Sequence, residues 1–143
     1  MNQRQIELVR ASFAKLPQDA EAVGTLFYAL LFKIDPELKP LFRGDMGRQS
    51  QLLVTMIASA VENLDRLELV LSAVRELGRR HAGYGVKEAD YDTVETALLL
   101  TLAQALGNEF TAEVRQAWIT CYRTLADVMK TAARQPATQA QAA

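Results

Sequence analysis

Hydrophobic residues recur every three or four positions along most of the chain, which is the spacing of one face of an α-helix. This pattern predicts helices over residues 6–16, 19–34, 48–63, 67–82 and 89–106, and a last helix that Thr111 caps. A shorter helical turn is expected over residues 35–42, where Asp35 precedes a proline at the first helical position. No alternating run of polar and apolar residues indicates a strand, so the predicted fold class is all-α.

The chain is predicted to form one domain, residues 1–133, followed by a flexible tail, residues 134–143. A length of 143 residues fits a single domain. No proline interrupts the interval from Leu41 to Gln135, which is rich in helix-forming residues. A loop is expected over residues 44–47. The tail consists mainly of Gln, Ala and Thr, a low-complexity composition typical of a frayed end.

Charge and cysteine content narrow the class of protein. The net charge is −1, so no excess of positive charge is present to neutralise a nucleic-acid backbone, and nucleic acid is not an expected partner. The single cysteine, Cys121, excludes an intrachain disulfide and is expected in the core. Neither a secretory signal nor an apolar stretch of about 20 residues is present, so we expect a cytoplasmic protein without a membrane span.

The only histidine, His81, continues the apolar stripe of its predicted helix into the last turn. One interpretation is a C-terminal cap, because histidine there can bond the last carbonyls and favours the helix dipole. The other is an axial metal ligand. A single histidine binds a free metal ion poorly, whereas haem brings four nitrogens of its own. If His81 holds a metal, that metal is therefore expected to be haem iron.

Three further residues have ordinary structural interpretations when taken singly. Tyr28 would be a core aromatic, one turn after Gly24, a mid-helix glycine that suggests close helix packing. Gln49 would face solvent at the start of its helix. Phe42 would pack at a corner after a proline.

Taken together, two segments point to a family. The run LFYALLFKIDPELKPLF, residues 26–42, resembles the second helix and following corner of globins, and LGRRHAGYGV, residues 77–86, resembles their proximal-histidine segment. The resemblance continues through Trp118 and Tyr122 and spans residues 4–132. Specifically, the chain is similar to the globin domains of bacterial flavohaemoglobins, to single-domain bacterial haemoglobins such as Hell's Gate globin I, and to neuroglobin.

This resemblance implies a globin fold, a three-over-three helical sandwich enclosing haem b, with His81 as the ligand of the iron. Phe42 matches the phenylalanine that stacks on haem, and Leu53 the distal apolar residue. The remaining haem contacts implied by the family lie at Leu77, Val86, Tyr91 and Val94. Tyr28 and Gln49 match the distal positions that contact a bound gas, where flavohaemoglobins carry tyrosine and glutamine.

The distal pair, Tyr28 and Gln49, can donate hydrogen bonds from one O–H and two N–H groups. Such donors in a dry pocket stabilise the partial negative charge of bound dioxygen, which predicts slow oxygen dissociation. Because the chain has no second histidine, coordination of the iron by two histidines is excluded.

One departure from the family concerns the proximal side. Flavohaemoglobins place a tyrosine–glutamate pair beside the proximal histidine. Tyr91 is present here, but Ala133 occupies the position of the glutamate. This substitution argues against strong electron donation toward bound oxygen and against peroxidase-like chemistry.

Three functions remain open from the sequence. The first is reversible binding of dioxygen or other diatomic ligands, for oxygen transport or storage. The second is nitric oxide dioxygenation, a detoxification reaction that would need an external electron donor or reductase, because no glycine-rich nucleotide fingerprint occurs in the chain. The third is a haem-free helical regulatory or interaction domain, which the presence of both His81 and Phe42 disfavours.

Overall fold

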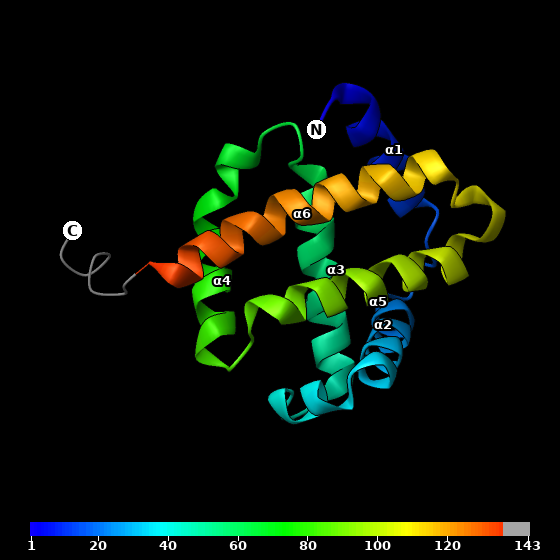
Figure 1. Cartoon of the computed structure of the whole chain (residues 1–143). Coiled ribbons are helices and arrows are strands. Elements are labelled where there is room, and N and C mark those ends of the chain that lie inside the picture. Colours follow the sequence, from blue (N-terminus) through cyan, green and yellow to red (C-terminus); the bar gives the residue numbers. More distant parts are fainter. Residues whose placement is uncertain (136–143) are drawn as a thin grey trace.

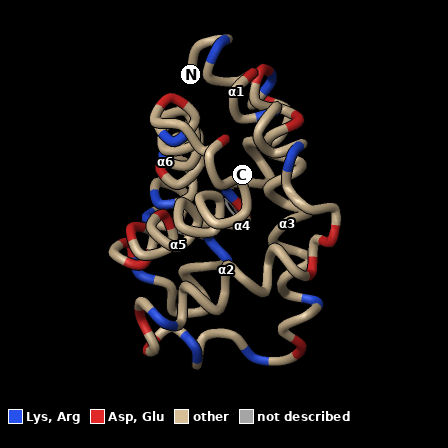
Figure 2. The backbone as a smooth tube through the Cα atoms, turned by 90° about the vertical axis from the view of Figure 1, so that its right-hand side faces the viewer, with Lys and Arg blue, Asp and Glu red and all other residues tan. Residues whose placement is uncertain are grey.

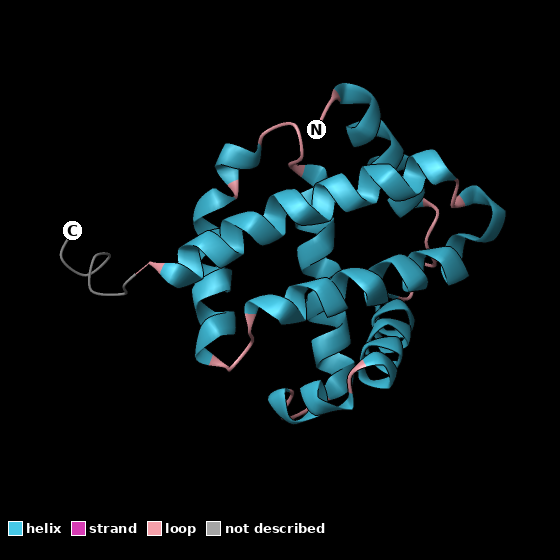
Figure 3. Ribbon diagram, in the orientation of Figure 1, coloured by secondary structure: helices cyan, strands magenta, loops and turns pink. Residues whose placement is uncertain are grey.

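The computed structural model describes residues 1–135, and this part of the chain is almost entirely helical (Figure 3). The α-helices are α1 (Gln3–Ala14), α2 (Ala20–Ile34), α3 (Met46–Glu62), α4 (Leu71–Gly83), α5 (Glu88–Leu106) and α6 (Ala112–Arg134). Short 3₁₀ helices are η1 (Pro36–Leu41), η2 (Leu67–Leu69) and η3 (Gly107–Glu109). No strand occurs within residues 1–135, which confirms the all-α prediction.

The six α-helices form two layers of three. One layer consists of α2, α5 and α6, in which α5 packs on both α2 and α6, and the other consists of α1, α3 and α4, in which α1 packs on α3. The layers meet where α4 lies against α6, α2 against α3, and α1 against α6. Figure 1 shows α5 and α6 running side by side across the front, with α3 passing behind both. This arrangement is the three-over-three sandwich that the sequence predicts.

Polar side chains begin three of the elements at the expected residues. The Asp19 carboxylate accepts a hydrogen bond from the Ala22 N–H at 3.1 Å and starts α2. The Asp35 carboxylate starts η1, and the Thr111 hydroxyl starts α6. Each cap satisfies an amide that has no partner within its own helix.

Three local predictions are wrong. The loop expected over residues 44–47 ends early, because the Asp45 carboxylate accepts from the Gly47 N–H at 2.9 Å and caps a helix that already includes Met46. The single helix expected over residues 67–82 is divided into η2 and α4. Apolar spacing within the helix predicted over residues 48–63 leads us to expect Met56 to point inward, but this side chain is 41% exposed. The predicted flexible tail begins at residue 134, but Arg134 is the last residue of α6. Residues 136–143 of that tail lie outside the part that the structure describes.

The larger hydrophobic core joins α1, α3, α5 and α6 around Trp118, which is 2% exposed. The Trp118 indole N–H donates to the Ser12 hydroxyl at 2.9 Å, so the buried ring has its polar atom satisfied. Cys121 is buried in the same core, as expected, and burial raises the pKa of its thiol to about 12. A smaller core lies between α2, η1 and α5.

Charged residues of both signs are interspersed along the backbone (Figure 2). This mixture agrees with the near-neutral net charge of the chain. None of the helices within residues 1–135 combines the length and hydropathy that crossing a membrane requires.

Candidate functional site

His81 lies in the last turn of α4, and its Nδ1 atom is 2.9 Å from the carbonyl oxygen of Leu77. A carbonyl can only accept, so Nδ1 carries the proton and donates, which leaves the Nε2 lone pair free for a metal. The C-terminal cap interpretation expected the ring to bond the last carbonyls of the helix, whereas Leu77 lies one turn earlier. The backbone thus fixes the orientation of the ring through Nδ1, which is the arrangement that a metal-binding histidine needs.

Burial lowers the pKa of His81, and the positive charge of Arg80 lowers it further, while the bond to Leu77 acts in the opposite direction. The imidazole is consequently neutral at physiological pH. A neutral imidazole is the form that binds iron.

Gly78 fixes α4 against α6 three residues before His81. A Cβ atom at this position would lie 2.6 Å from the Met129 Cα and still nearer to the Met129 carbonyl oxygen. No side chain fits at that distance, so only glycine permits this crossing. The backbone of α6 therefore determines how closely the helix that bears His81 approaches the core.

The distal pair is brought together as predicted. Tyr28 lies on α2 and is 5% exposed, and Gln49 lies in the first turn of α3. The Gln49 Nε2 donates to the Tyr28 hydroxyl oxygen at 3.2 Å. Because Tyr28 accepts this bond, its own hydroxyl proton is free to donate to a third group.

Burial also raises the pKa of Tyr28, and the bond from Gln49 offsets part of that rise. The phenol therefore stays protonated and remains a donor at physiological pH.

Aromatic rings surround the Tyr28 side chain. The Phe42 ring lies edge-on at 5.1 Å between centroids, and the Phe32 ring stacks at 5.9 Å. Phe27 approaches from the same helix at 5.0 Å. Edge-to-face contacts of this kind favour defined ring orientations, so the hydroxyl of Tyr28 is held in a largely apolar setting.

A second glycine, Gly24, brings α2 and α3 into close contact one turn before Tyr28. A Cβ atom here would lie 2.5 Å from the Ser50 Cβ. The close packing suggested by this mid-helix glycine is thus confirmed. Ser50 is 1% exposed, and its hydroxyl has no hydrogen-bond partner among the described residues.

The other predicted contacts fall into two groups. Leu53 and Val94 pack with Phe42 against the small core that contains Tyr28. Leu77 and Val86 belong to the His81 segment, where the Val86 N–H donates to the His81 carbonyl at 3.0 Å. Within residues 1–135 no hydrogen bond joins the two groups.

Tyr91, the remaining predicted contact, is 8% exposed at the start of α5. The Tyr122 hydroxyl donates to the Tyr91 carbonyl at 2.7 Å, and the Lys130 ammonium lies 5.5 Å from the centre of the Tyr91 ring. Ala133, half-buried on α6, supplies no carboxylate. The nearby acid Glu88 is paired with Arg134 instead.

Sequence reasoning missed two features of this site. The role of the Leu77 carbonyl could not be found, because any residue presents the same backbone oxygen. Gly78 could have been found, because it is a mid-helix glycine like Gly24 and lies close to a candidate ligand.

The residues present fit a haem. Haem needs from the protein one imidazole nitrogen and an apolar setting, and its macrocycle supplies the other iron ligands. His81 offers a free Nε2, and Phe42, Leu53 and Val94 offer apolar contact surface.

The Globin family model matches residues 25–129. Similar curated proteins are the flavohemoproteins of Oceanobacillus iheyensis, 29% identical over 131 residues, and of Halalkalibacterium halodurans, 31% identical over 131 residues. Each match covers 90% of this chain but only 32% of the relative. The chain therefore spans about a third of the length of these relatives.

Comparison with solved structures agrees with the family match. An engineered carbene transferase from Rhodothermus marinus, named as a candidate nitric oxide dioxygenase, superposes with a TM-score of 0.84 at 27% identity, covering 99% of this chain and 96% of that one. A bacterial globin from Campylobacter jejuni superposes with a TM-score of 0.81 at 27% identity, covering 93% and 96%. The architecture, the family match and these structures together show that the chain belongs to the globin family.

Proposed function

We propose that this chain binds haem b with His81 Nε2 as the protein ligand of the iron, and that it reversibly binds dioxygen and other diatomic gases beside Tyr28 and Gln49. Membership of the globin family implies a haem cofactor and small gaseous ligands. The residues that would contact the macrocycle are Phe42, Leu53, Leu77, Val86, Tyr91 and Val94. The observation that carries the proposal is the hydrogen bond from Gln49 to Tyr28.

When bound, haem supplies an iron atom that takes up a diatomic gas and transfers electron density to it. The protein's part is to stabilise the resulting partial charge. Tyr28 can donate its hydroxyl proton toward the ligand, because its oxygen is already held by Gln49. A hydrogen bond to a charged acceptor contributes about 1.5–3 kcal/mol, more than one between neutral groups. These donors favour retention of the ligand over its release.

The proximal side supports reversible binding. His81 donates to a neutral backbone carbonyl, whereas a carboxylate acceptor would make the imidazole more basic. Neither Tyr91 nor Ala133 brings a free carboxylate to the ring. A less basic imidazole donates less electron density, which disfavours cleavage of an O–O bond.

Nitric oxide dioxygenation is the second candidate. The Rhodothermus marinus protein is named for this reaction, and the flavohemoproteins match over the same span of residues. The same distal donors would hold oxygen for attack by nitric oxide. Sustained turnover would then require a separate reductase or small reductant to return the iron to its ferrous state.

The test is an absorption spectrum of the purified protein in the ferric state, after reduction with dithionite, and after exposure to oxygen. A Soret band that shifts to a stable oxygenated form is expected. Absence of a Soret band after addition of haem would contradict the proposal and indicate a haem-free interaction domain. Nitric oxide is then mixed with the oxygenated protein. Stoichiometric nitrate formation that continues with an added reductase would favour the dioxygenase.

A further inference from the structure

One face of α2 meets the first turns of α3 at three points. Glu21, Gly24 and Tyr28 lie three and four residues apart, so they share one side of the helix. Gly24 packs against Ser50, and Tyr28 accepts the hydrogen bond from Gln49. Glu21 makes the third contact, one turn before Gly24. The distal pair therefore lies at one end of a row of contacts whose other end is an exposed carboxylate.

The Glu21 carboxylate lies over the beginning of α3. Its Oε2 atom accepts a long hydrogen bond, 3.5 Å, from the Gln51 side-chain amide. Its Oε1 atom lies 2.6 Å from the position that a Cβ atom would take at Gly47, the second residue of α3. The first N–H groups of a helix lack partners within it and favour a nearby negative charge. Two features of α3 thus attract this carboxylate, the helix N-terminus and the Gln51 amide.

Gly47 makes this close approach possible. A Cβ atom at this position would lie 2.6 Å from the Glu21 carboxylate and 3.2 Å from that of Asp45. Glycine is otherwise unfavourable in a helix, because it loses more conformational freedom on folding than any other residue. Among residues 1–135 no basic side chain forms an ion pair with Glu21. No such pair therefore draws the Glu21 carboxylate away from α3.

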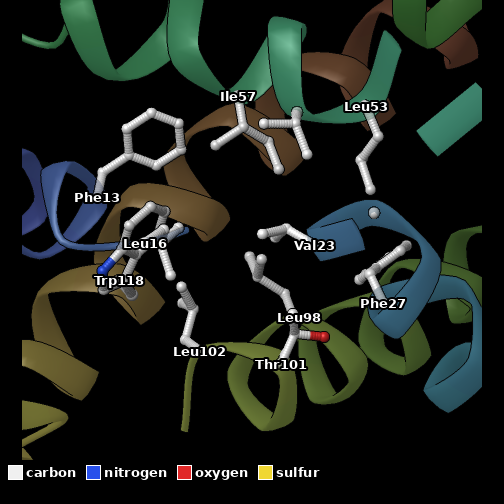
Figure 4. Close-up of a pocket in the computed structure, with 12 residues that line it drawn as sticks. Phe13, Leu16, Val23, Phe27, Leu53, Ile57, Leu98, Thr101, Leu102 and Trp118 are labelled. Atoms are coloured by element: carbon white, nitrogen blue, oxygen red, sulfur yellow. The ribbon is translucent and has the colours of Figure 1, made fainter. Parts of the chain in front are cut away.

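On the side of Val23 and Phe27, the crossing of α2 and α3 is incompletely packed. An apolar cavity of about 20 Å³ lies there, between these two side chains and those of Leu53 and Ile57 on α3 (Figure 4). Side chains that border an empty space lose dispersion contacts on that side. The row of contacts that begins at Glu21 therefore contributes most to the positioning of the first turns of α3 against α2.

We propose that Glu21 is a positioning residue for the distal pair: its carboxylate holds the first turn of α3 where Gln49 reaches the Tyr28 hydroxyl. This inference rests on the proposed function, which assigns Tyr28 and Gln49 to the bound gas. Gln49 lies between Gly47 and Gln51, the two residues that Glu21 contacts. Movement of this turn away from α2 lengthens the bond from Gln49 to Tyr28, which measures 3.2 Å when the turn is held.

The side-chain amide of Gln49 reports this bond in the full chain without haem. Its NMR signal is assigned by its absence in Gln49→Leu, and Tyr28→Phe gives the chemical shift of the amide without its acceptor. Glu21→Ala is expected to move the signal most of the way to that shift. Glu62→Ala, which removes the same charge from the last residue of α3, is the matched control and should leave the signal in place. A signal that Glu21→Ala does not move would overturn the proposal, whether or not the protein binds haem.

Gly47→Ala separates positioning from stability. The added Cβ displaces only the end of the flexible Glu21 side chain, and alanine stabilises a helix better than glycine does. The melting temperature should therefore stay equal or rise, while the Gln49 signal moves as it does in Glu21→Ala. A role of Glu21 in stability alone predicts that the Gln49 signal stays in place in Gly47→Ala, and that result would refute the positioning role.

Oxygen release tests whether Glu21 acts through Gln49 in the haem-loaded protein. Glu21→Ala is expected to raise the oxygen dissociation rate about threefold, the effect of weakening one hydrogen bond. The same change made in Gln49→Leu should have no further effect, because the group that Glu21 positions is already absent. An equal rise in both backgrounds would show that Glu21 acts without Gln49 and overturn the proposal. Failure of the protein to take up haem would refute the proposed function and leave the NMR test of Glu21 intact.

Discussion

The two sides of the candidate site are both built on a glycine that allows two helices to cross closely. On the distal side Gly24 of α2 meets Ser50 of α3, one turn before Tyr28. On the proximal side Gly78 of α4 meets Met129 of α6, three residues before His81. In each pair the glycine determines how near the functional side chain comes to the other helix.

The crossings differ in what the glycine meets. Gly24 faces the side chain and backbone of a small residue, and the functional groups nearby bond to each other through their side chains. Gly78 faces only backbone atoms, and His81 is held by a backbone carbonyl. A substitution of Ser50 can therefore remove one of the close contacts on the distal side, whereas the nearest contacts on the proximal side are all backbone atoms that every residue carries.

Burial acts on both sides and produces neutral groups on each. It raises the pKa of the Tyr28 phenol and lowers that of the His81 imidazole. Burial thus leaves a protonated phenol, a hydrogen-bond donor, on one side and a neutral imidazole, the proposed iron ligand, on the other.

Removing the proximal ligand is expected to have the largest effect. His81→Gly should abolish stable haem incorporation, because no other histidine exists to replace it. Haem content is measured from the Soret absorbance after reconstitution. Added imidazole should restore part of the band in His81→Gly, which a merely misfolded protein would not show. A variant that retains full haem without imidazole would place the ligand elsewhere.

The next largest effect is expected from adding one methyl group at Gly78, where α4 crosses α6. Gly78→Ala forces a Cβ against the Met129 backbone, and overpacking of this kind costs about 1–3 kcal/mol of unfolding free energy. Gly83→Ala is the matched control in the same helix, because nothing lies within 4 Å of a Cβ there. The control should leave stability unchanged or raise it by about 0.5–1 kcal/mol. Urea titration of both variants checks the difference, and equal midpoints would refute the role of Gly78.

The same glycine-to-alanine change at the crossing of α2 and α3 should cost less stability when Ser50, the residue opposite Gly24, is also changed. Gly24→Ala is expected to destabilise the protein by about 1–3 kcal/mol, because the new Cβ would lie 2.5 Å from that of Ser50. Ser50→Gly removes the opposing Cβ but leaves the Ser50 Cα and carbonyl oxygen 2.6 Å from the new atom, so the double variant should recover only a small part of the loss. Thermal unfolding of the single and double variants measures this coupling. Strictly additive effects would contradict it.

The distal pair itself should affect ligand release rather than haem binding. Tyr28→Phe is expected to raise the oxygen dissociation rate by more than about tenfold, since it removes a donor to a partly charged acceptor. Gln49→Leu should have a smaller effect, because the Tyr28 hydroxyl remains. Stopped-flow displacement of oxygen by carbon monoxide measures both rates. An unchanged rate in Tyr28→Phe would assign the main donor role to Gln49.

The positions of most helices, and one part of the candidate site, could be predicted from the sequence. Helix periodicity and the predicted caps Asp35 and Thr111 located the helices, because these signals are local. The pairing of Tyr28 with Gln49 was predicted through the family resemblance.

Features that depend on tertiary contact were not predictable in this way. The Leu77 carbonyl is chemically identical to every other backbone carbonyl, and its role follows only from the side-chain conformation of His81. Met56 shares the spacing of its inward neighbours, yet its exposure depends on which helices pack against α3. The apolar cavity lined by Leu53, Val54 and Trp118 and the open pocket beside Pro17 are formed by side chains of several helices, so no single segment of sequence encodes them.

The smallest expected effect is a change in the oxygen dissociation rate at alkaline pH, which depends on the ionisation of Tyr28. Because burial raises the pKa of Tyr28 above the ordinary value of 10.0, its hydroxyl stays protonated, and oxygen dissociation should be flat from about pH 7 to about pH 9.5.

Above the unfolded pKa of a tyrosine, about 10, the unfolded chain releases a proton that the native protein still holds, so native stability falls as pH rises toward the raised pKa. The oxygen dissociation rate should stay flat over that range and increase only when the pH reaches the raised pKa of Tyr28 in the native protein, where the phenol ionises and can no longer donate. Tyr28→Phe should remove the alkaline rise in rate while leaving its own faster rate independent of pH. A rise that persists in Tyr28→Phe would assign the titration to another group and separate the distal donor from the pH response.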